Sequence, residues 1–445
     1  MSVPQRVTQN QCFIYLRKGK EETDMELLEE ILNQNNLNKA YKKVIANKGV
    51  AGIDGITIEE EFDYLKENKD RILNQIRKRK YKPQPVKRVQ IPKENGKMRN
   101  LGIPTVTDRI IQQAIFQVIS PIFEKQFNDN SFGFRPNRSC EQAVVRALEY
   151  LNNGYEWIVD IDLEKFFDTV NQDKLITIIG KTISDGDVVS LMRKYLSAGV
   201  MEKGIVKPTY VGTPQGGNLS PLLSNIMLNE LDKELEARGL NFVRYADDCI
   251  IVVKSEKAAN RVLTSITKFI EKKLGLKVNA EKSKVTQPTD TKYLGYSFWQ
   301  NKKKQWRPKP HIKSFQKLER KLKELTNRSW SISLDNRIKK INYVVRGWVN
   351  YFRIADMKNM LIKIDKHLRT RIRVIIWKQW KKTMRRYKAL RQLGVSHEIA
   401  FNCANTRKGY YQICKSRYIQ FAINNERLRK RGLVFLLDQY EKVHI

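Results

Sequence analysis

The sequence predicts an α+β fold followed by a helical, strongly basic region. Two apolar, strand-like segments, residues 157–163 and 242–253, carry paired aspartates, and helical patterns with marked ends alternate with them, which favours a mixed or antiparallel sheet. Residues 301–445 hold 38 basic and 9 acidic side chains, a net charge of +29, whereas residues 1–300 carry only +8. A chain of 445 residues is long enough for two to four domains.

The N-terminal part is predicted to be helical after a polar leader at residues 1–24. A helical pattern begins at Met25 and continues through Leu27, Leu28, Ile31 and Leu32. A second helix is expected over residues 37–46, and Gly52 to Gly55 is expected to form a tight loop.

A basic hairpin is predicted next, because residues 86–91 alternate and Asn95-Gly96 is a strong turn signal. Its cationic side chains are Lys87, Arg88, Lys93, Lys97 and Arg99. They form either a solvated face or a clamp for a triphosphate, and the acidic segments further along the chain favour the clamp.

Three later helices have recognisable ends. Ser139 and Gln142 make a capping box, while Ser220 reads as an N-cap followed by a proline at the first helical position. Gly239 follows the last turn of that second helix, and an apolar stripe beginning at Ala259 ends at Gly275.

The aspartates suggest a metal site. Asp247 and Asp248 are adjacent between apolar runs, and buried like charges persist only if a cation or a folded turn compensates them. An isolated pair is better explained as a solvent-facing turn. However, Asp160 and Asp162 lie in phase on one strand face, so three or four carboxylates become available for Mg²⁺. Two such ions suit nucleotidyl transfer.

The C-terminal third is predicted to follow a linker at residues 300–311 and to be helical, with one buried face over residues 338–352. Its charge indicates a nucleic-acid partner. A membrane partner is disfavoured, because the sequence has no signal peptide and no apolar run of spanning length. The five cysteines and four histidines show no metal-ligand spacing, which favours a reducing, cytoplasmic compartment.

Several motifs together resemble the group II intron-encoded reverse transcriptases, or maturases, of the short bacterial class that lacks an endonuclease domain. The motifs are Ile91 to Lys93, Arg99 to Pro104, Ser131 to Pro136, Asp160 to Asp168, Gly212 to Pro221, Tyr245 to Asp248, Lys292 to Gly295 and Arg346 to Phe352. Only residues 1–24 lie outside the resemblance.

The resemblance implies a right-hand polymerase fold, with fingers and a palm that contains an antiparallel sheet, followed by an α-helical thumb. The implied domains are an N-terminal extension with fingers at 25–110, a palm with the remaining fingers at 111–300, a thumb or maturase domain X at 301–386, and a small basic DNA-binding-like domain at 387–445.

The resemblance also assigns the catalytic residues. Asp162, Asp247 and Asp248 match the ligands of two Mg²⁺ ions, for which Mn²⁺ is a possible substitute. The residues alone do not separate Asp160 from Asp162; the family's aromatic gate, which follows the ligand by five residues, selects Asp162 because Phe167 then fits. That ring excludes a 2′-hydroxyl, so deoxyribonucleotides are selected.

Further contacts follow from the same comparison of motifs. Lys93 and Arg99 match residues that hold the triphosphate, and Gln215 matches the glutamine beneath the incoming nucleotide. Weaker candidates for contacts with template, primer or RNA are Arg135, Lys282, Trp377, Lys378 and Lys381. Arg135 and Lys282 could equally be structural ion-pair partners, and the tryptophan a core anchor.

The implied function is an RNA-directed DNA polymerase that binds its own intron RNA to assist splicing and copies it during retrohoming. Its expected partners are intron RNA, an RNA template with a DNA primer, target DNA and dNTPs. Without an endonuclease module, insertion would use reverse splicing and a host-supplied primer. Two alternatives stay open: a splicing protein whose polymerase site is vestigial, and a relative domesticated for DNA repair or host defence.

Overall fold

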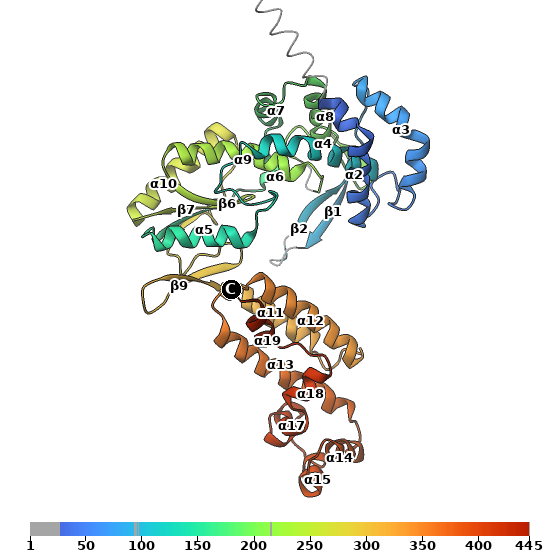
Figure 1. Cartoon of the computed structure of the whole chain (residues 1–445), viewed down its shortest axis with the longest axis vertical. Helices are drawn as coiled ribbons and strands as arrows, with labels where there is room; N and C mark the ends of the chain where they lie inside the picture. Colours follow the sequence, from blue (N-terminus) through green and yellow to red (C-terminus); the bar gives the residue numbers. More distant parts are fainter. Residues whose placement is uncertain (1–26, 93–95, 97, 214–215, 445) are drawn as a thin grey trace, which may run out of the picture. The chain divides into compact units, whose positions relative to one another are not determined.

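The computed structural model describes residues 27–92, 96, 98–213 and 216–444. The chain divides into two compact units, Met1–Thr286 and Gln287–Ile445 (Figure 1). The first unit mixes sheets with many helices, as predicted, whereas the second is mainly helical and also contains a strand pair.

The first unit is built around buried helices. Its helices are α2 (Gln34–Ala46), α3 (Glu61–Arg77), α4 (Val106–Glu124), α5 (Cys140–Asn152), α6 (Phe166–Thr169), α7 (Gln172–Gly180), α8 (Gly186–Leu196), α9 (Ser220–Ala237) and α10 (Glu256–Phe269), which continues into the π-helical turn η1 (Ile270–Leu274). Residues 27–32 are also helical, as expected. The first ten residues of α4 are all buried, so α4 is a central element of this core.

An antiparallel sheet lies at one side of this unit. Its strands are β3 (Trp157–Ile161), β6 (Asn241–Tyr245), β7 (Asp248–Val253) and β8 (Lys284–Thr286), in the order β6-β7-β3-β8. Helix α5 covers one face, and α9 and α10 cover the other (Figure 1). The antiparallel sheet expected from the two acidic segments is therefore confirmed, and both segments are neighbouring strands in it.

A second, mixed sheet contains the predicted basic hairpin. Strands β1 (Val86–Pro92) and β2 (Met98–Ile103) pair antiparallel, while β4 (Val200–Glu202) runs parallel to β1 and pairs antiparallel with β5 (Ile205–Lys207). The hairpin strands are confirmed. Lys93 and Lys97 lie outside the described residues.

Most helix ends agree with the sequence signals. The capping box of Ser139 and Gln142 is present, and Gly275 ends η1 in the left-handed conformation with φ +70°. The predicted N-cap at Ser220 is wrong. Its amide already donates to the carbonyl of Gly217, so a turn starts the helix one residue earlier, and Leu219 takes the N-cap position.

The second unit begins with a strand pair where a linker was predicted. Strands β9 (Tyr296–Gln300) and β10 (Trp306–Pro310) are antiparallel, so the linker prediction for 300–311 is wrong. Alternate residues of β10, Trp306, Pro308 and Pro310, are buried. Each strand of a two-stranded sheet is an edge strand, where proline is tolerated because its missing N–H is not needed.

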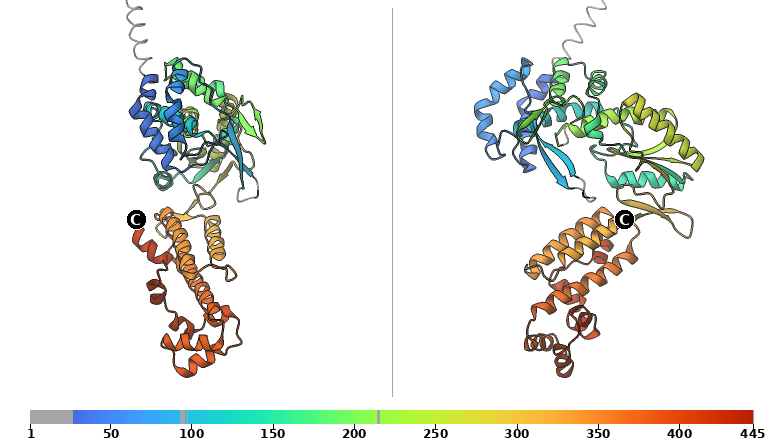
Figure 2. Two further views of the ribbon diagram at one scale, coloured as in Figure 1. Left: turned by 90° about the vertical axis from the view of Figure 1, so that its right-hand side faces the viewer. Right: turned by 180° about the vertical axis from the view of Figure 1, so that it is seen from behind.

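The rest of the second unit is helical, as predicted. Its helices are α11 (Ile312–Leu325), α12 (Leu334–Tyr351), α13 (Lys358–Gln379), α14 (Thr383–Gln392), α15 (His397–Ala404), α16 (Tyr410–Cys414), α17 (Arg417–Ala422), α18 (Asn425–Lys430) and α19 (Leu436–Val443). Helices α11, α12 and α13 lie alongside one another (Figures 1 and 2). The face of α12 with Ile338, Ile341 and Val345 is buried. Among the described helices, none has the length and apolar character needed to cross a bilayer.

Candidate active site

Three of the predicted carboxylates gather where β3 and β7 lie side by side. The register pairs Ile161 with Cys249, so Asp162, the next residue, stands opposite Asp248. Asp160 lies two residues before Asp162, diagonally across from Asp248. Opposite and diagonal residues on one face of an antiparallel pair are close enough to interact, so the two acidic segments contribute to one acidic cluster.

The charges in this cluster affect one another. Burial, together with the negative charges of Asp248 and Asp162, raises the pKa of Asp160 to about 6, although Lys284 opposes this effect. Asp162 is held differently, because Lys282 donates to its two carboxylate oxygens over 3.1 and 3.0 Å. Its backbone amide donates to Ser283 Oγ over 3.0 Å. The alternative prediction for Lys282, an ion-pair partner, agrees with this contact, and its role at primer or template stays a prediction.

A tight turn joins β6 to β7 and contains Asp247. Tyr245 pairs with Asp248, and Ala246 has a φ of +57°, whereas Asp247 has no positive φ. This is the pattern of a type II′ turn, which normally has glycine at its first central position. The left-handed conformation costs a residue such as Ala246 about 1 kcal/mol. The turn leaves Asp247 half-buried and Asp248 exposed.

The donors suit a hard divalent cation, although they are not assembled around one. In the described part of the chain, no three Asp, Glu, His or Cys side chains are grouped closely enough to hold a metal ion. Asp160, Asp162 and Asp248 nevertheless offer carboxylate oxygens, the ligands that Mg²⁺ prefers. The raised pKa of Asp160 reflects first its burial and then the negative charges of Asp248 and Asp162. A cation at Asp162 would compete with the ammonium group of Lys282.

Phe167 lies on the short helix α6, directly after the acidic strand. Phe166 is 2% exposed and belongs to the core, whereas Phe167 is half-buried and its ring lies 5.2 Å from that of Phe166. The carbonyl of Phe167 accepts a hydrogen bond from the amide of Thr213 over 2.6 Å. A Cβ on Gly212, whose φ is +92°, would come within 2.7 Å of that carbonyl.

The loop after Gly212 approaches the basic hairpin. A Cβ on Gly216 would meet the carbonyl of Gly102 on β2 at 2.3 Å, so only glycine allows this contact. Arg99 is exposed on β2 opposite Ile91. The structure therefore brings the loop near the hairpin that carries Arg99, while Gln215 and Lys93 themselves lie outside the described residues.

Two of the weaker candidates for nucleic-acid contacts, Arg135 and Trp377, have partners within the fold. Arg135 is 8% exposed; it pairs with Glu124 at 2.8 Å and donates to the carbonyls of Asn128 and Ser131. Trp377 is 0% exposed and packs against Trp380. These contacts agree with the alternatives that the sequence left open, an ion-pair partner for Arg135 and a core anchor for Trp377, and a role for either residue at nucleic acid stays a prediction. Lys378 and Lys381 are exposed.

Sequence reasoning missed a buried polar group next to the turn, formed by Asn225, Asp232 and Arg244. Part of the signal was present: Arg244 interrupts the apolar strand before Tyr245, and Asn225 and Asp232 are polar residues on the buried face of α9. The sequence did not show that the three side chains bond to one another, because these bonds join segments that are distant in the chain.

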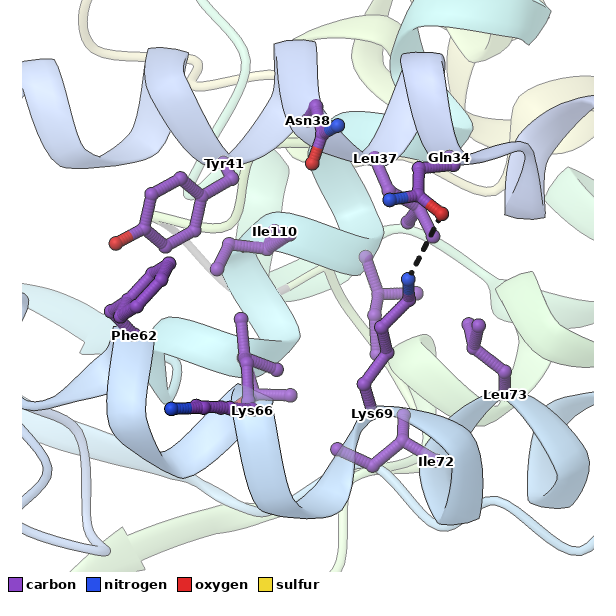
Figure 3. Close-up of a pocket in the computed structure, with 13 residues that line it drawn as sticks. Gln34, Leu37, Asn38, Tyr41, Phe62, Lys66, Lys69, Ile72, Leu73 and Ile110 are labelled. Carbon is purple, nitrogen blue, oxygen red and sulfur yellow. Dashed lines mark hydrogen bonds between the residues drawn. The ribbon is translucent and has the colours of Figure 1, made fainter.

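An apolar cavity of the first unit lies away from the acidic cluster. It measures about 410 Å³ between α2, α3 and α4, and Figure 3 shows Tyr41, Phe62 and Ile110 around it. Lys69 Nζ donates to Gln34 Oε1 at its edge over 3.3 Å. None of its lining residues is acidic, so it offers no carboxylate chemistry.

Comparisons with known proteins agree with this geometry. The family described as reverse transcriptase (RNA-dependent DNA polymerase) matches residues 91–298, and the group II intron, maturase-specific domain matches residues 315–394. Protein YkfC of Escherichia coli (strain K12) is 32% identical over 304 residues, 59% of this chain and 80% of YkfC. The group II intron-encoded protein LtrA of Lactococcus lactis subsp. cremoris is 31% identical over 362 residues, 66% of this chain but only 59% of LtrA.

Among solved structures, the partial Cas6-RT-Cas1--Cas2 complex matches with a TM-score of 0.36 and 22% identity. This match covers 55% of the present chain and 42% of that one.

Proposed function

The chain belongs to the family of group II intron-encoded reverse transcriptases, and we propose that it copies RNA into DNA at the cluster of Asp162, Asp247 and Asp248. The observation that carries this proposal is the meeting of Asp162 and Asp248 across β3 and β7, with Asp247 in the adjoining turn. Phe167 lies on α6, the short helix that follows β3 in the chain.

In the proposed mechanism, these three aspartates would hold two Mg²⁺ ions. When bound, the ions supply positive charge to the attacking and leaving oxygens of nucleotidyl transfer. The protein's own side chains do the rest. The Phe167 ring limits space at the sugar, and Arg99 with Lys93 binds the triphosphate as a fork and a point charge. Gln215, by its match to the family's motif, is proposed to contact the incoming nucleotide.

The second unit is proposed to bind nucleic acid. Residues 301–445 carry a net charge of +29, which attracts a phosphate backbone. Within them we propose a thumb, or domain X, at 301–386 and a DNA-binding region at 387–445, after fingers at 25–110 and a palm at 111–300. The partners are the intron RNA, whose splicing the protein assists and which it copies in retrohoming, and the target DNA. We place this ribonucleoprotein in the cytoplasm.

Primer extension on an RNA template with a DNA primer, dNTPs and Mg²⁺ tests the polymerase. The wild-type protein extends the primer, and Asp247→Ala lowers the rate by at least about 10³-fold, because a charge-stabilising ligand is lost. Asp70→Ala, which removes an exposed carboxylate from α3, serves as the control and retains activity. An inactive wild-type protein would instead support a splicing factor with a vestigial site.

A further inference from the structure

We propose that Asn225, Asp232 and Arg244 are positioning residues that fix the turn at Ala246 and thereby the placement of Asp247 and Asp248. This inference rests on the proposed function, since it assigns those aspartates to the reaction. It concerns a buried network behind the acidic cluster, formed by α9, β6 and the loop before α5.

Arg244 is the centre of the network. It is 0% exposed, and its guanidinium group makes a bidentate ion pair with Asp232, with Nε 2.7 Å from Oδ1 and Nη2 2.5 Å from Oδ2. The remaining nitrogen, Nη1, donates to Asn225 Oδ1 and to the carbonyl of Ala246, each over 3.0 Å. One arm of the network therefore ends on the backbone of the turn.

A second arm reaches the turn from the loop before α5. Asn225 Nδ2 donates to the carbonyl of Gly133 over 2.8 Å. A Cβ on Gly133 would lie 2.2 Å from the amide nitrogen of Ala246, so the two backbones are in direct contact. The same loop is tied to β6, because the amide of Phe132 donates to the carbonyl of Arg244 over 2.8 Å.

The two arms act on the same residue, the left-handed Ala246. Arg244 binds its carbonyl, and Gly133, held by Asn225, packs against its amide. A buried ion pair contributes little stability compared with apolar packing, but it enforces one geometry, because any other leaves a charge unpaired. The network is thus suited to hold an unfavourable turn conformation that directs Asp247 and Asp248.

Asn225→Ala is the informative variant, because it removes both bonds of Asn225 and leaves the ion pair of Arg244 with Asp232. Asn229→Ala is a matched control: Asn229 lies one turn further along α9 and is 4% exposed, but its Nδ2 donates to the carbonyl of Gln126 over 3.2 Å. Both variants lose a buried amide, and only Asn225→Ala loses the bonds to Gly133 and Arg244, both of which contact Ala246.

Two readouts are measured on the full chain. The first is Mn²⁺ binding followed by electron paramagnetic resonance, which does not depend on polymerase activity. The second is primer extension, analysed as kcat and as KM for dNTP. We expect Asn225→Ala to weaken Mn²⁺ binding by at least about fivefold and to lower kcat at least about tenfold, with a KM within about twofold of wild type.

The outcomes separate this inference from the proposed function. If Asn225→Ala matches Asn229→Ala in Mn²⁺ affinity and kcat, while both melt at similar temperatures, the network is only structural and the inference fails. If the wild-type protein binds Mn²⁺ but extends no primer, the proposed function fails. In that case the Mn²⁺ titration of Asn225→Ala still decides whether the network positions the aspartates. Arg244→Lys, which retains the charge but not the fork, is expected to resemble Asn225→Ala.

Discussion

Phe166 and Phe167 are neighbours in sequence, yet the fold gives them different surroundings. Phe166 is buried at 2% exposure, whereas Phe167 is half-buried, next to the segment of Gly212 and Thr213. The hydrogen bond between the Thr213 amide and the Phe167 carbonyl fixes the backbone of Phe167 rather than its ring. The ring packs at the edge of the core beside Phe166 and stays partly exposed, so part of its surface is available for contact with a substrate.

Phe167→Ala is accordingly expected to relax sugar discrimination. Removing the ring opens space for a 2′-hydroxyl, so the preference for dNTP over rNTP, taken as the ratio of kcat/KM values, should fall at least about tenfold. Single-nucleotide incorporation on an RNA template measures the ratio. Phe166→Ala is the control, because it should lower stability through core packing while the ratio stays the same. Equal ratios for wild type and Phe167→Ala would show that Phe167 does not select against the 2′-hydroxyl.

At the residue scale, the sequence predicted the acidic residues of the site, but it did not predict the buried polar residues that pack behind them. The in-phase spacing of Asp160 and Asp162 and the adjacent Asp247 and Asp248 were sufficient to predict an acidic cluster. The spacing could not decide between Asp160 and Asp162, since alternate strand residues share a face. The bonds from Arg244 to α9 were not predictable, because they join segments that meet only in the folded chain.

At the scale of elements, local signals were reliable where local contacts decide the structure. The capping box at Ser139 involves residues three apart and was predicted correctly. The pair β9 and β10 was missed, because Pro308 and Pro310 usually mark a break, and their tolerance here depends on β10 being an edge strand. Strand pairing is a property of two segments, and one segment's composition does not determine it.

The packing of α3 on α4 contains a buried acid that should make stability depend on pH. Glu61 is 0% exposed and accepts a hydrogen bond from Thr107 Oγ1 over 2.7 Å, and its Oε2 has no hydrogen-bond partner within the described structure. Burial is the main cause that raises the pKa of Glu61 to about 7; Thr107 opposes it, and the charge of Asp54 adds to it.

We therefore expect Glu61→Gln to stabilise the protein at alkaline pH. Because the folded-state pKa is raised, the protonated acid favours the fold below pH ~4.5, and this contribution is lost as pH rises through about 7. At pH 8 the variant should gain on the order of 2 kcal/mol relative to wild type, and at pH 4 the two should coincide. Thermal unfolding at both pH values measures the difference. A constant difference across pH would show that Glu61 does not titrate in this range.

At the scale of the whole molecule, charge is distributed unevenly along the chain. Residues 1–300 carry +8 and hold the acidic cluster, while residues 301–445 carry +29 and have only 9 acidic side chains. The residues proposed for catalysis and most of the positive charge that attracts nucleic acid thus lie in different parts of the sequence. This division explains why composition alone could predict a nucleic-acid partner, whereas the reaction had to be inferred from a few spaced residues.

The basic region is therefore expected to dominate the salt dependence of RNA binding. Each phosphate that the protein neutralises adds about 0.7 to 0.9 to the slope of log affinity against log salt. Replacing the exposed Lys378, Lys381 and Lys382 with alanine should make that slope shallower by about 2 and weaken binding at least about tenfold. Filter binding of a structured RNA at KCl concentrations from about 50 to about 300 mM measures the slope.

The matched control removes the same number of charges from the first unit, at the exposed Lys257, Arg261 and Lys268 of α10. If both triple variants reduce the slope equally, net charge alone drives binding, since a general field does not depend on where the charges lie. If only the variant at Lys378, Lys381 and Lys382 reduces it, phosphates contact that surface directly. If neither changes it, the RNA is held elsewhere, and the assignment of these lysines to nucleic-acid binding is wrong.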